Sequence, residues 1–314
     1  MKKINYIAEL CQNHLGKFEN IKRMTEKCAE NGASTIKLQS IYTKNLSYRP
    51  EFENGIKIKR PYVKEFNRLK KLEISLKDFE KFVRLCEKLN VEPSVTCFSR
   101  NDIHNLKNIG FNTVKVASYD CASFKLLKEL KQNFKNLIIS TGATYDDEIE
   151  KAAMVVKNNF TFLHCVTIYP TPLNEMHFNR IDFLKKKFGK AGFSDHSLGF
   201  GKFRNLATKI EIYKGASVVE RHITIMDKDK TKDGPVSIQP KDIREIVNFS
   251  ELSKTDQKIY LNENYNYNIQ KTFGFSKRNL SHEEILNRDY YRGRFSSYNK
   301  KSQRMIYNWE EVEI

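Results

Sequence analysis

Residues 137–164 read LIISTGATYDDEIEKAAMVVKNNFTFLH, with two short apolar runs on either side of an amphipathic segment. The runs at 137–140 and 161–164 have the length of buried strands, and residues 146–156 carry apolar side chains at three- and four-residue intervals. A strand, a helix and a second strand in this order predict one repeat of an α/β fold with a parallel sheet.

The same repeat extends along most of the chain. Apolar runs that suit buried strands lie at 4–10, 35–39, 92–98, 113–117, 137–140, 161–164, 191–194 and 217–222, and further amphipathic segments lie at 20–31, 76–89 and 202–213. Eight alternations over about 250 residues match a (β/α)8 TIM barrel. The competitor is a doubly wound open sheet. Residues 8–16, AELCQNHLG, lack the glycine spacing of a dinucleotide-binding turn, so we prefer the barrel.

Two segments lie outside the repeat. Residues 41–73 are longer than a typical strand-to-helix connection and rich in Lys, Arg and Tyr, so we expect them to cover the barrel mouth. From residue 255 the periodicity fades into a polar, Tyr-rich stretch. We therefore expect a barrel at 1–254 and a short C-terminal appendage at 255–314.

Composition narrows the function classes. Lys plus Arg number 55 against 38 Asp plus Glu, and the net charge of +17 favours anionic ligands. These charges are spread along the chain and accompany one Trp and no stacking motif, so nucleic acid is not an expected partner. The sequence has no secretory leader, no window of eighteen apolar residues and no paired cysteine motif. We expect a soluble cytoplasmic protein with reduced cysteines and no membrane contact.

Polar residues gather where the predicted strands end, which is where TIM barrels build their active sites. They are Glu9, Lys37, Gln39, Thr96, Lys115, Ser118, Asp120, Ser140, Thr167, Tyr169, Ser194, His196, Glu220 and His222. A lysine inside a strand is costly unless its charge is compensated. Two such lysines among hydroxyls predict a buried anion, with a phosphate as the natural ligand. The alternative is that Lys37 and Lys115 simply pair with Glu9 and Asp120.

His196 and His222 end neighbouring strands, each beside a carboxylate. Their imidazoles are candidates to bind one divalent cation. Asp195 or Glu220 would then contact the ion through a water molecule or orient one of the histidines. A histidine that is simply part of the core remains the alternative for each.

Eight motifs follow the predicted strands in order: IAELCQNHLG, STIKLQ, PSVTCFS, VKVAS, IISTGAT, LHCVTIYPTP, GFSDHSLG and VVERHIT. Together they resemble the sialic acid synthase family, which comprises N-acetylneuraminate synthase and its nonulosonate relatives. The resemblance covers roughly residues 4–250. It implies a metal-dependent condensation of phosphoenolpyruvate with an N-acetylated aldose, which makes a nine-carbon 2-keto acid and releases phosphate.

The resemblance also implies roles for these residues. Phosphoenolpyruvate would be held by Lys37, Thr96, Lys115, Ser118, Ser140 and Ser194. Mn²⁺ or Mg²⁺ would be bound by His196 and His222, and would polarise the aldehyde oxygen of the sugar. Protons would be managed by Glu9, Asp120 and Glu220, although Asp120 stands where the familiar synthases have the longer Glu. Gln39, Thr167 and Tyr169 would lie near the acceptor sugar.

Three departures from the family pattern concern the sugar. Thr167 replaces an asparagine, and Val236 replaces an aspartate that binds the sugar. The familiar members also end in an antifreeze-like domain that donates an arginine to the partner subunit's site, and LNRDYYRGRFSS at 286–297 resembles only its start. Arg292 or Arg294 could replace that arginine, with a surface role as the alternative. We expect the donor chemistry to be retained and the acceptor to differ.

Other readings remain open. The acceptor could be a different, phosphorylated aldose contacted by Lys57, Lys59 and Arg60, although these residues could equally form a solvated loop. A homodimer or a second chain could complete the site. A degenerate barrel that binds without turnover is the alternative outside the enzymes.

Overall fold

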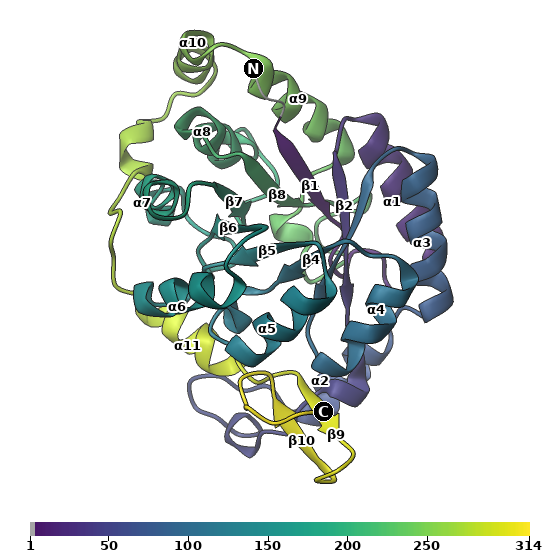
Figure 1. Ribbon diagram of the computed structural model, residues 1–314. Helices are drawn as coiled ribbons and strands as arrows, with labels where there is room; N and C mark the ends of the chain where they lie inside the picture. The colour runs from purple at the N-terminus through teal and green to yellow at the C-terminus, as the bar shows by residue number, and fades with distance from the viewer. Residues whose placement is uncertain (1–3) are drawn as a thin grey trace.

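The computed structural model describes residues 4–314, and its eight parallel strands form one closed barrel in which β1 pairs with both β2 and β8 (Figure 1). The strands are β1 Asn5–Glu9, β2 Thr35–Ser40, β3 Glu92–Cys97, β4 Thr113–Val116, β5 Asn136–Ser140, β6 Phe160–His164, β7 Ala191–Asp195 and β8 Val218–His222. The predicted (β/α)8 TIM barrel is confirmed, and every predicted strand boundary lies within one residue of the observed one.

Helices surround the barrel. They are α1 Phe18–Glu30, α3 Leu76–Lys88, α4 Ile103–Ile109, α5 Phe124–Asn133, α6 Asp146–Val156, α7 Asn179–Phe188, α8 Leu206–Lys214 and α9 Pro240–Glu251. The helix predicted at 202–213 begins later, at Leu206. Residues 201–204 form a turn instead, and the carbonyl of Arg204 accepts a hydrogen bond of 3.0 Å from the buried Arg221 guanidinium.

Alternation along the strands separates the core from the barrel interior. On β2, Ile36 and Leu38 belong to the large core cluster beneath the helices, while Lys37 between them reaches residues of the barrel interior. The lower interior is closed by a separate apolar cluster of Ile7, Ile138, Leu163 and Val218. Toward the carboxyl ends of the strands, the register sets Glu9 level with both Lys37 and His222. The barrel interior is therefore apolar toward the amino ends of the strands and polar toward their carboxyl ends.

The chain after the barrel returns to the barrel mouth. Helix α10, Lys254–Asn264, packs against α8, and the chain then passes α7 and α6 to α11, His282–Tyr291, and to a hairpin of β9, Ser296–Asn299, and β10, Arg304–Tyr307 (Figure 1). Within the 41–73 segment, α2 spans Tyr62–Lys70. This segment meets the returning chain where Leu46 bridges Phe295 and the Ser47 amide donates to the Arg294 carbonyl at 2.9 Å.

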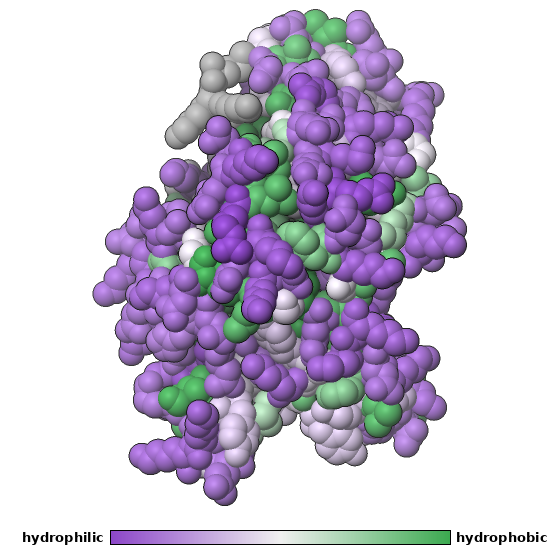
Figure 2. Space-filling model, turned by 90° about the vertical axis from the view of Figure 1, so that its right-hand side faces the viewer, coloured by the Kyte–Doolittle hydropathy of each residue, from purple (hydrophilic) through white to green (hydrophobic). Residues whose placement is uncertain are grey.

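The surface agrees with the charged composition. Figure 2 shows a face that is mostly hydrophilic, with hydrophobic residues in small separate patches. Among residues 4–314, no helix has both the length and the apolar character needed to cross a bilayer.

Candidate active site

Four ionisable side chains meet inside the barrel. The Lys37 ammonium is in close contact with the Glu9 carboxylate, and Glu220 lies 3.7 Å from Lys37 Nζ and 3.6 Å from Lys115 Nζ. None of these side chains is more than 5% exposed. Two ammonium groups are thus compensated by two carboxylates, and the predicted pairing of Lys37 with Glu9 is present, whereas Lys115 faces Glu220 rather than Asp120.

Hydroxyl groups complete this buried cluster. Lys37 donates to Thr96 Oγ1 at 2.7 Å, Lys115 donates to Ser140 Oγ at 2.6 Å, and Ser194 donates to Glu220 Oε1 at 2.8 Å. Burial alone raises the pKa of the Glu220 carboxyl, but Lys115 and Lys37 outweigh burial and lower that pKa to about 2. The carboxylate is therefore ionised. Burial lowers the pKa of Lys37 to about 7, so an incoming anion at this lysine would favour its charged form. Lys37, Lys115 and their hydroxyl partners form the floor of the site.

The two predicted metal ligands lie side by side at the edge of this cluster. The rings of His196 and His222 are 5.4 Å apart, and both side chains are buried. His196 Nδ1 lies 3.1 Å from the Val166 carbonyl, which can only accept, so this nitrogen carries the proton and Nε2 keeps its lone pair. His222 Nδ1 is buried without a hydrogen-bond partner. Burial lowers the pKa of His196 to about 4 and that of His222 below its ordinary value, so both rings are neutral, as metal binding requires.

The fit to a metal ion is partial. Within residues 4–314, no group of three or more His, Cys, Asp or Glu side chains is arranged to hold one. The histidine pair suits a divalent cation only if water or substrate oxygens complete the coordination. Asp195 is not available as a metal ligand, because its carboxylate is already engaged. It pairs with Arg221 of β8 at 2.5 Å and accepts from Thr208 Oγ1 of α8 at 2.6 Å.

A cavity of about 460 Å³ reaches His222. The residues singled out from the sequence that line it are Gln39, Arg60, Asp120, Tyr169, His222, Val236 and Arg294. Tyr169 packs on the His196 ring at a centroid distance of 4.4 Å. A pocket of this size, lined by His222 and by Cys11, whose amide donates to Glu9 Oε1 of the buried cluster at 2.6 Å, is a candidate active site.

Ser118 and Thr167 lie behind the cavity wall. The Ser118 hydroxyl is 3.1 Å from Cys165 Sγ, and Thr167 Oγ1 is buried without a partner. Both pack against Gly142, where a Cβ atom would come within 2.6 Å of Thr167 Cγ2 and 3.0 Å of Ser118 Oγ. This close approach explains the glycine at 142.

Residues 24–258 match the NeuB family. The chain belongs to the NeuB family. The resemblance to the sialic acid synthases seen in the sequence is thereby confirmed.

Individual relatives agree with this assignment. The N,N'-diacetyllegionaminic acid synthase of Campylobacter jejuni is 29% identical over 303 residues, which cover 91% of this NeuB-family chain and 88% of that protein. Uncharacterized protein MJ1065 of Methanocaldococcus jannaschii is 32% identical over 250 residues, 77% of this chain and 68% of that one. Among solved structures, an N-acetylneuraminic acid (sialic acid) synthetase from Leptospira borgpetersenii in complex with citrate superposes with a TM-score of 0.69 at 26% identity, covering 92% of this chain and 91% of that one.

The outer wall of the cavity comes from the C-terminal chain. The sequence offered Arg294 of this wall as a candidate sugar-site arginine, but it did not signal Asn287 and Tyr291. Asn287, Tyr291 and Arg294 line the cavity, and Asn287 Nδ2 donates to the Thr167 carbonyl at 2.8 Å. Further along, Asn308 Nδ2 donates at 3.0 Å to Asp120 Oδ1, which also accepts from Ser123 at 2.8 Å. Burial raises the pKa of Asp120, and these two donors oppose the rise. No local pattern around residue 308 signals this role, because its partner lies 188 residues away.

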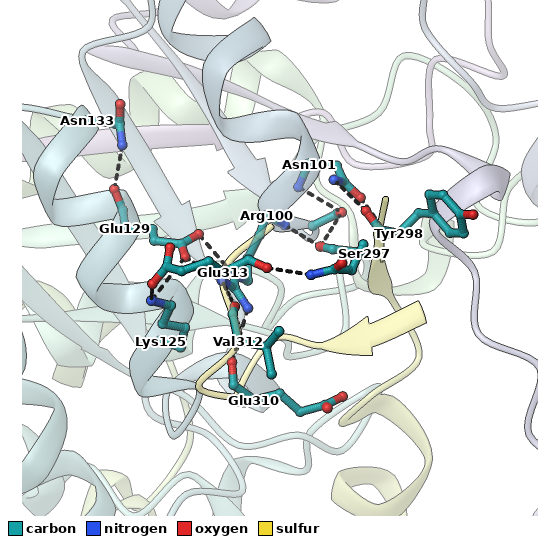
Figure 3. Close-up of polar contacts among 12 residues, drawn as sticks. Arg100, Asn101, Lys125, Glu129, Asn133, Ser297, Tyr298, Glu310, Val312 and Glu313 are labelled. Carbon is teal, nitrogen blue, oxygen red and sulfur yellow. Dashed lines mark hydrogen bonds and ion pairs between the residues drawn. The ribbon is translucent and has the colours of Figure 1, made fainter. Parts of the chain in front are cut away.

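Buried ionic contacts hold the end of the chain in place (Figure 3). Arg100, whose side chain is 0% exposed, pairs with Glu129 and donates to the carbonyls of Glu310 at 3.1 Å and Val312 at 2.6 Å. Lys125 pairs with Glu313, while Ser297 bonds Ser99 at 2.9 Å. The chain end is therefore fastened to the turn that follows β3 and to α5, so Asn308 is held beside Asp120.

Proposed function

We propose that this chain is a carbon–carbon bond-forming transferase that condenses phosphoenolpyruvate with an N-acetylated aldose, N-acetylmannosamine or a related amino sugar, to give a sialic-acid-like 2-keto acid and phosphate. Membership of the NeuB family, with relatives named as nonulosonate synthases, supports condensation of phosphoenolpyruvate with a sugar. The observation that carries the proposal is the floor formed by the buried pair Lys37 and Lys115 with their hydroxyl partners, next to two neutral histidines of which His222 lines the cavity.

The donor binds on that floor. The phosphate and carboxylate of phosphoenolpyruvate replace Glu9 and Glu220 as partners of the two ammonium groups, while the hydroxyls of Thr96, Ser140 and Ser194 donate to its oxygens. Ser118 lies close behind this floor. Binding of the anion therefore frees two carboxylates inside a site that excludes bulk water.

The freed carboxylates manage the protons. The C3 atom of the enol phosphate attacks the aldehyde carbon, which forms the new carbon–carbon bond, and the aldehyde oxygen takes up a proton. Water adds to C2 and gives one proton to Glu9 or Glu220. The bond from C2 to the phosphate oxygen then breaks, the leaving phosphate takes up the remaining hydroxyl proton, and C2 becomes a ketone. Asp120, held by Asn308, faces the cavity, where Gln39 and Tyr169 lie near the sugar. Thr167 lies behind the wall of the same cavity. Mn²⁺ or Mg²⁺, when bound by His196 and His222, supplies Lewis-acid polarisation of the aldehyde.

One chain supplies the outer wall on the acceptor side. Because α11 and the segment after it form the outer wall, the proposal needs no second subunit to complete the cavity. That the protein forms a homodimer and that it is located in the cytoplasm are still predictions from the sequence.

The test measures phosphate released from phosphoenolpyruvate with Mn²⁺ and a panel of N-acetylated aldoses, with and without EDTA. We expect release that requires one aldose and the metal, and that is lost in Lys115→Met but kept in Lys107→Met, which changes an exposed lysine. Silence with every aldose, with no protection by phosphoenolpyruvate against thermal unfolding, would favour the degenerate barrel.

A further inference from the structure

Three hydrogen-bonded side chains form one wall of the cavity. Gln39 Nε2 donates to Cys11 Sγ at 3.1 Å, and the Cys11 thiol donates to Asp233 Oδ2 at 2.8 Å. All three residues line the cavity, and they come from β2, from the turn after β1 and from the loop after β8. Three separate parts of the barrel mouth are thus joined through one thiol.

The backbone of Cys11 is in an unfavourable conformation. Its φ of +44° lies in the left-handed region that favours glycine. The side chain is buried, and burial together with the charge of Asp233 raises the pKa of the thiol well above its usual range, so the thiol keeps its proton and donates it. Within residues 4–314, this thiol bonds Gln39 and Asp233 alone. A side chain kept at a strained position indicates that these two contacts serve the site.

The loop that carries Asp233 is held in place by its own contacts. The buried Asn13 donates to Ser237 Oγ at 2.9 Å, and the Ser237 hydroxyl donates to the Asp233 carbonyl at 2.6 Å. At Gly234, a Cβ atom would come within 2.0 Å of the Lys228 carbonyl oxygen, so this turn requires glycine. The loop therefore holds Asp233 at a defined place in the cavity wall.

The wall offers hydrogen-bond acceptors to a ligand. Of the three carboxylates on the loop after β8, Asp233 lines the cavity, whereas Asp227 and Asp229 are exposed. The thiol takes up Asp233 Oδ2, and none of the described residues donates to Asp233 Oδ1 or to Gln39 Oε1. Two acceptor oxygens on one wall suit a ligand with two neighbouring donors, such as the hydroxyl and acetamido N–H groups of a sugar.

We propose that Asp233 binds a hydroxyl or N–H group of the acceptor sugar, that Gln39 accepts from the group beside it, and that Cys11 is the positioning residue that holds both. This inference rests on the proposed condensation and adds two residues to its acceptor site. The Cys11 amide also donates to Glu9 Oε1 at 2.6 Å, so the same residue joins the acceptor wall to a carboxylate that manages protons.

The test compares Asp233→Asn with the wild type, using phosphoenolpyruvate, Mn²⁺ and the preferred aldose of the panel. We expect the KM for the aldose to rise about 10-fold, as the loss of a hydrogen bond to a charged group predicts, and the KM for phosphoenolpyruvate to stay unchanged. With the analogue of the aldose that lacks the contacted donor, the same substitution should change KM less than about 3-fold. The matched control Asp229→Asn changes an exposed aspartate of the same loop and should have no effect.

A second pair of variants tests the positioning role of Cys11. Cys11→Ala removes the donor and should raise the KM for the aldose about 3- to 10-fold with little change in kcat. Cys11→Ser keeps a donor and should restore the KM. If both variants are equally impaired, or if neither is, Cys11 does not position the wall.

The outcomes separate this inference from the condensation itself. An aldose KM that Asp233→Asn leaves unchanged, or an equal rise in the KM for phosphoenolpyruvate, would overturn the acceptor role of Asp233 and leave the condensation standing. If no aldose supports turnover, calorimetric titration of the same panel against the whole chain still decides. Binding that weakens in Asp233→Asn and not in Asp229→Asn would support the site, whereas binding of no aldose, or binding that neither variant changes, would overturn it.

Discussion

Replacing Arg100 by methionine should release the C-terminal hairpin from the barrel. The arginine side chain is 0% exposed and makes two hydrogen bonds to Glu129, of 2.9 and 2.5 Å, besides those to the carbonyls of Glu310 and Val312 (Figure 3). Methionine keeps much of the apolar stem but none of the donors. The variant therefore tests the charged contacts rather than packing.

The magnitude follows from burial. Removing one partner of a buried ion pair costs about 3–5 kcal/mol. Because the Glu129 side chain is 19% exposed and can regain water, we expect the lower end, about 3 kcal/mol. For a chain of 314 residues that loss corresponds to a fall in Tm of roughly 4–5 °C. The double variant Arg100→Met/Glu129→Met should lose less than the sum of the two single losses, since the residues act together.

The assay combines thermal unfolding with limited proteolysis after residue 291, and Arg84→Met, an exposed arginine on α3, is the matched control. We expect Arg100→Met to be cleaved faster in the hairpin and Arg84→Met to behave as wild type. A loss of stability below about 1 kcal/mol together with unchanged proteolysis would refute the view that these contacts fasten the chain end.

Three further outcomes are expected. Asn308→Ala removes a donor to Asp120, so it should raise the pKa of Asp120 and move the acid limb of the kcat/KM profile to higher pH; an unmoved limb would contradict that positioning role. Gly142→Ala should lower the free energy of unfolding in urea by about 1–3 kcal/mol through overcrowding of Thr167 and Cys165, and an unchanged midpoint would show that the site has room. Burial raises the pKa of Asp102 to about 7, so the folded state holds a proton that the unfolded state has released, and stability falls as pH rises from about 4 to about 7. Asp102→Asn should therefore gain about 2–4 kcal/mol over wild type between pH 4 and pH 8 in denaturant titrations, and a pH-independent difference would be the contrary result.

The strands were predictable because each is a short apolar run whose burial is set by local sequence. The same holds for the placing of polar residues at strand ends, since the carboxyl ends of all eight strands meet at one mouth. The start of α8 was not predictable, because the turn before it is held by Arg221 from the following strand.

Side-chain contacts between residues far apart in the chain could not be predicted from the sequence. Spacing alone does not reveal that Glu220 sits between Lys37 and Lys115, or that Asp195 turns outward to Arg221. The position of residues 255–314 was the largest feature that the sequence did not predict. Their polar, Tyr-rich sequence carries little periodicity, and their position is decided by contacts such as Asn308 with Asp120, which join residues far apart in the chain.

The central claim is tested most directly with phosphoenolpyruvate that carries oxygen-18 in the bridge between C2 and phosphorus. The reaction, run with Mn²⁺ and the preferred aldose, is analysed by mass spectrometry of the released phosphate and of the sugar product. The account predicts phosphate that retains the label and a product equal to the aldose plus the three carbons of the donor. Unlabelled phosphate with an unchanged sugar would mean simple hydrolysis at phosphorus and would contradict the account.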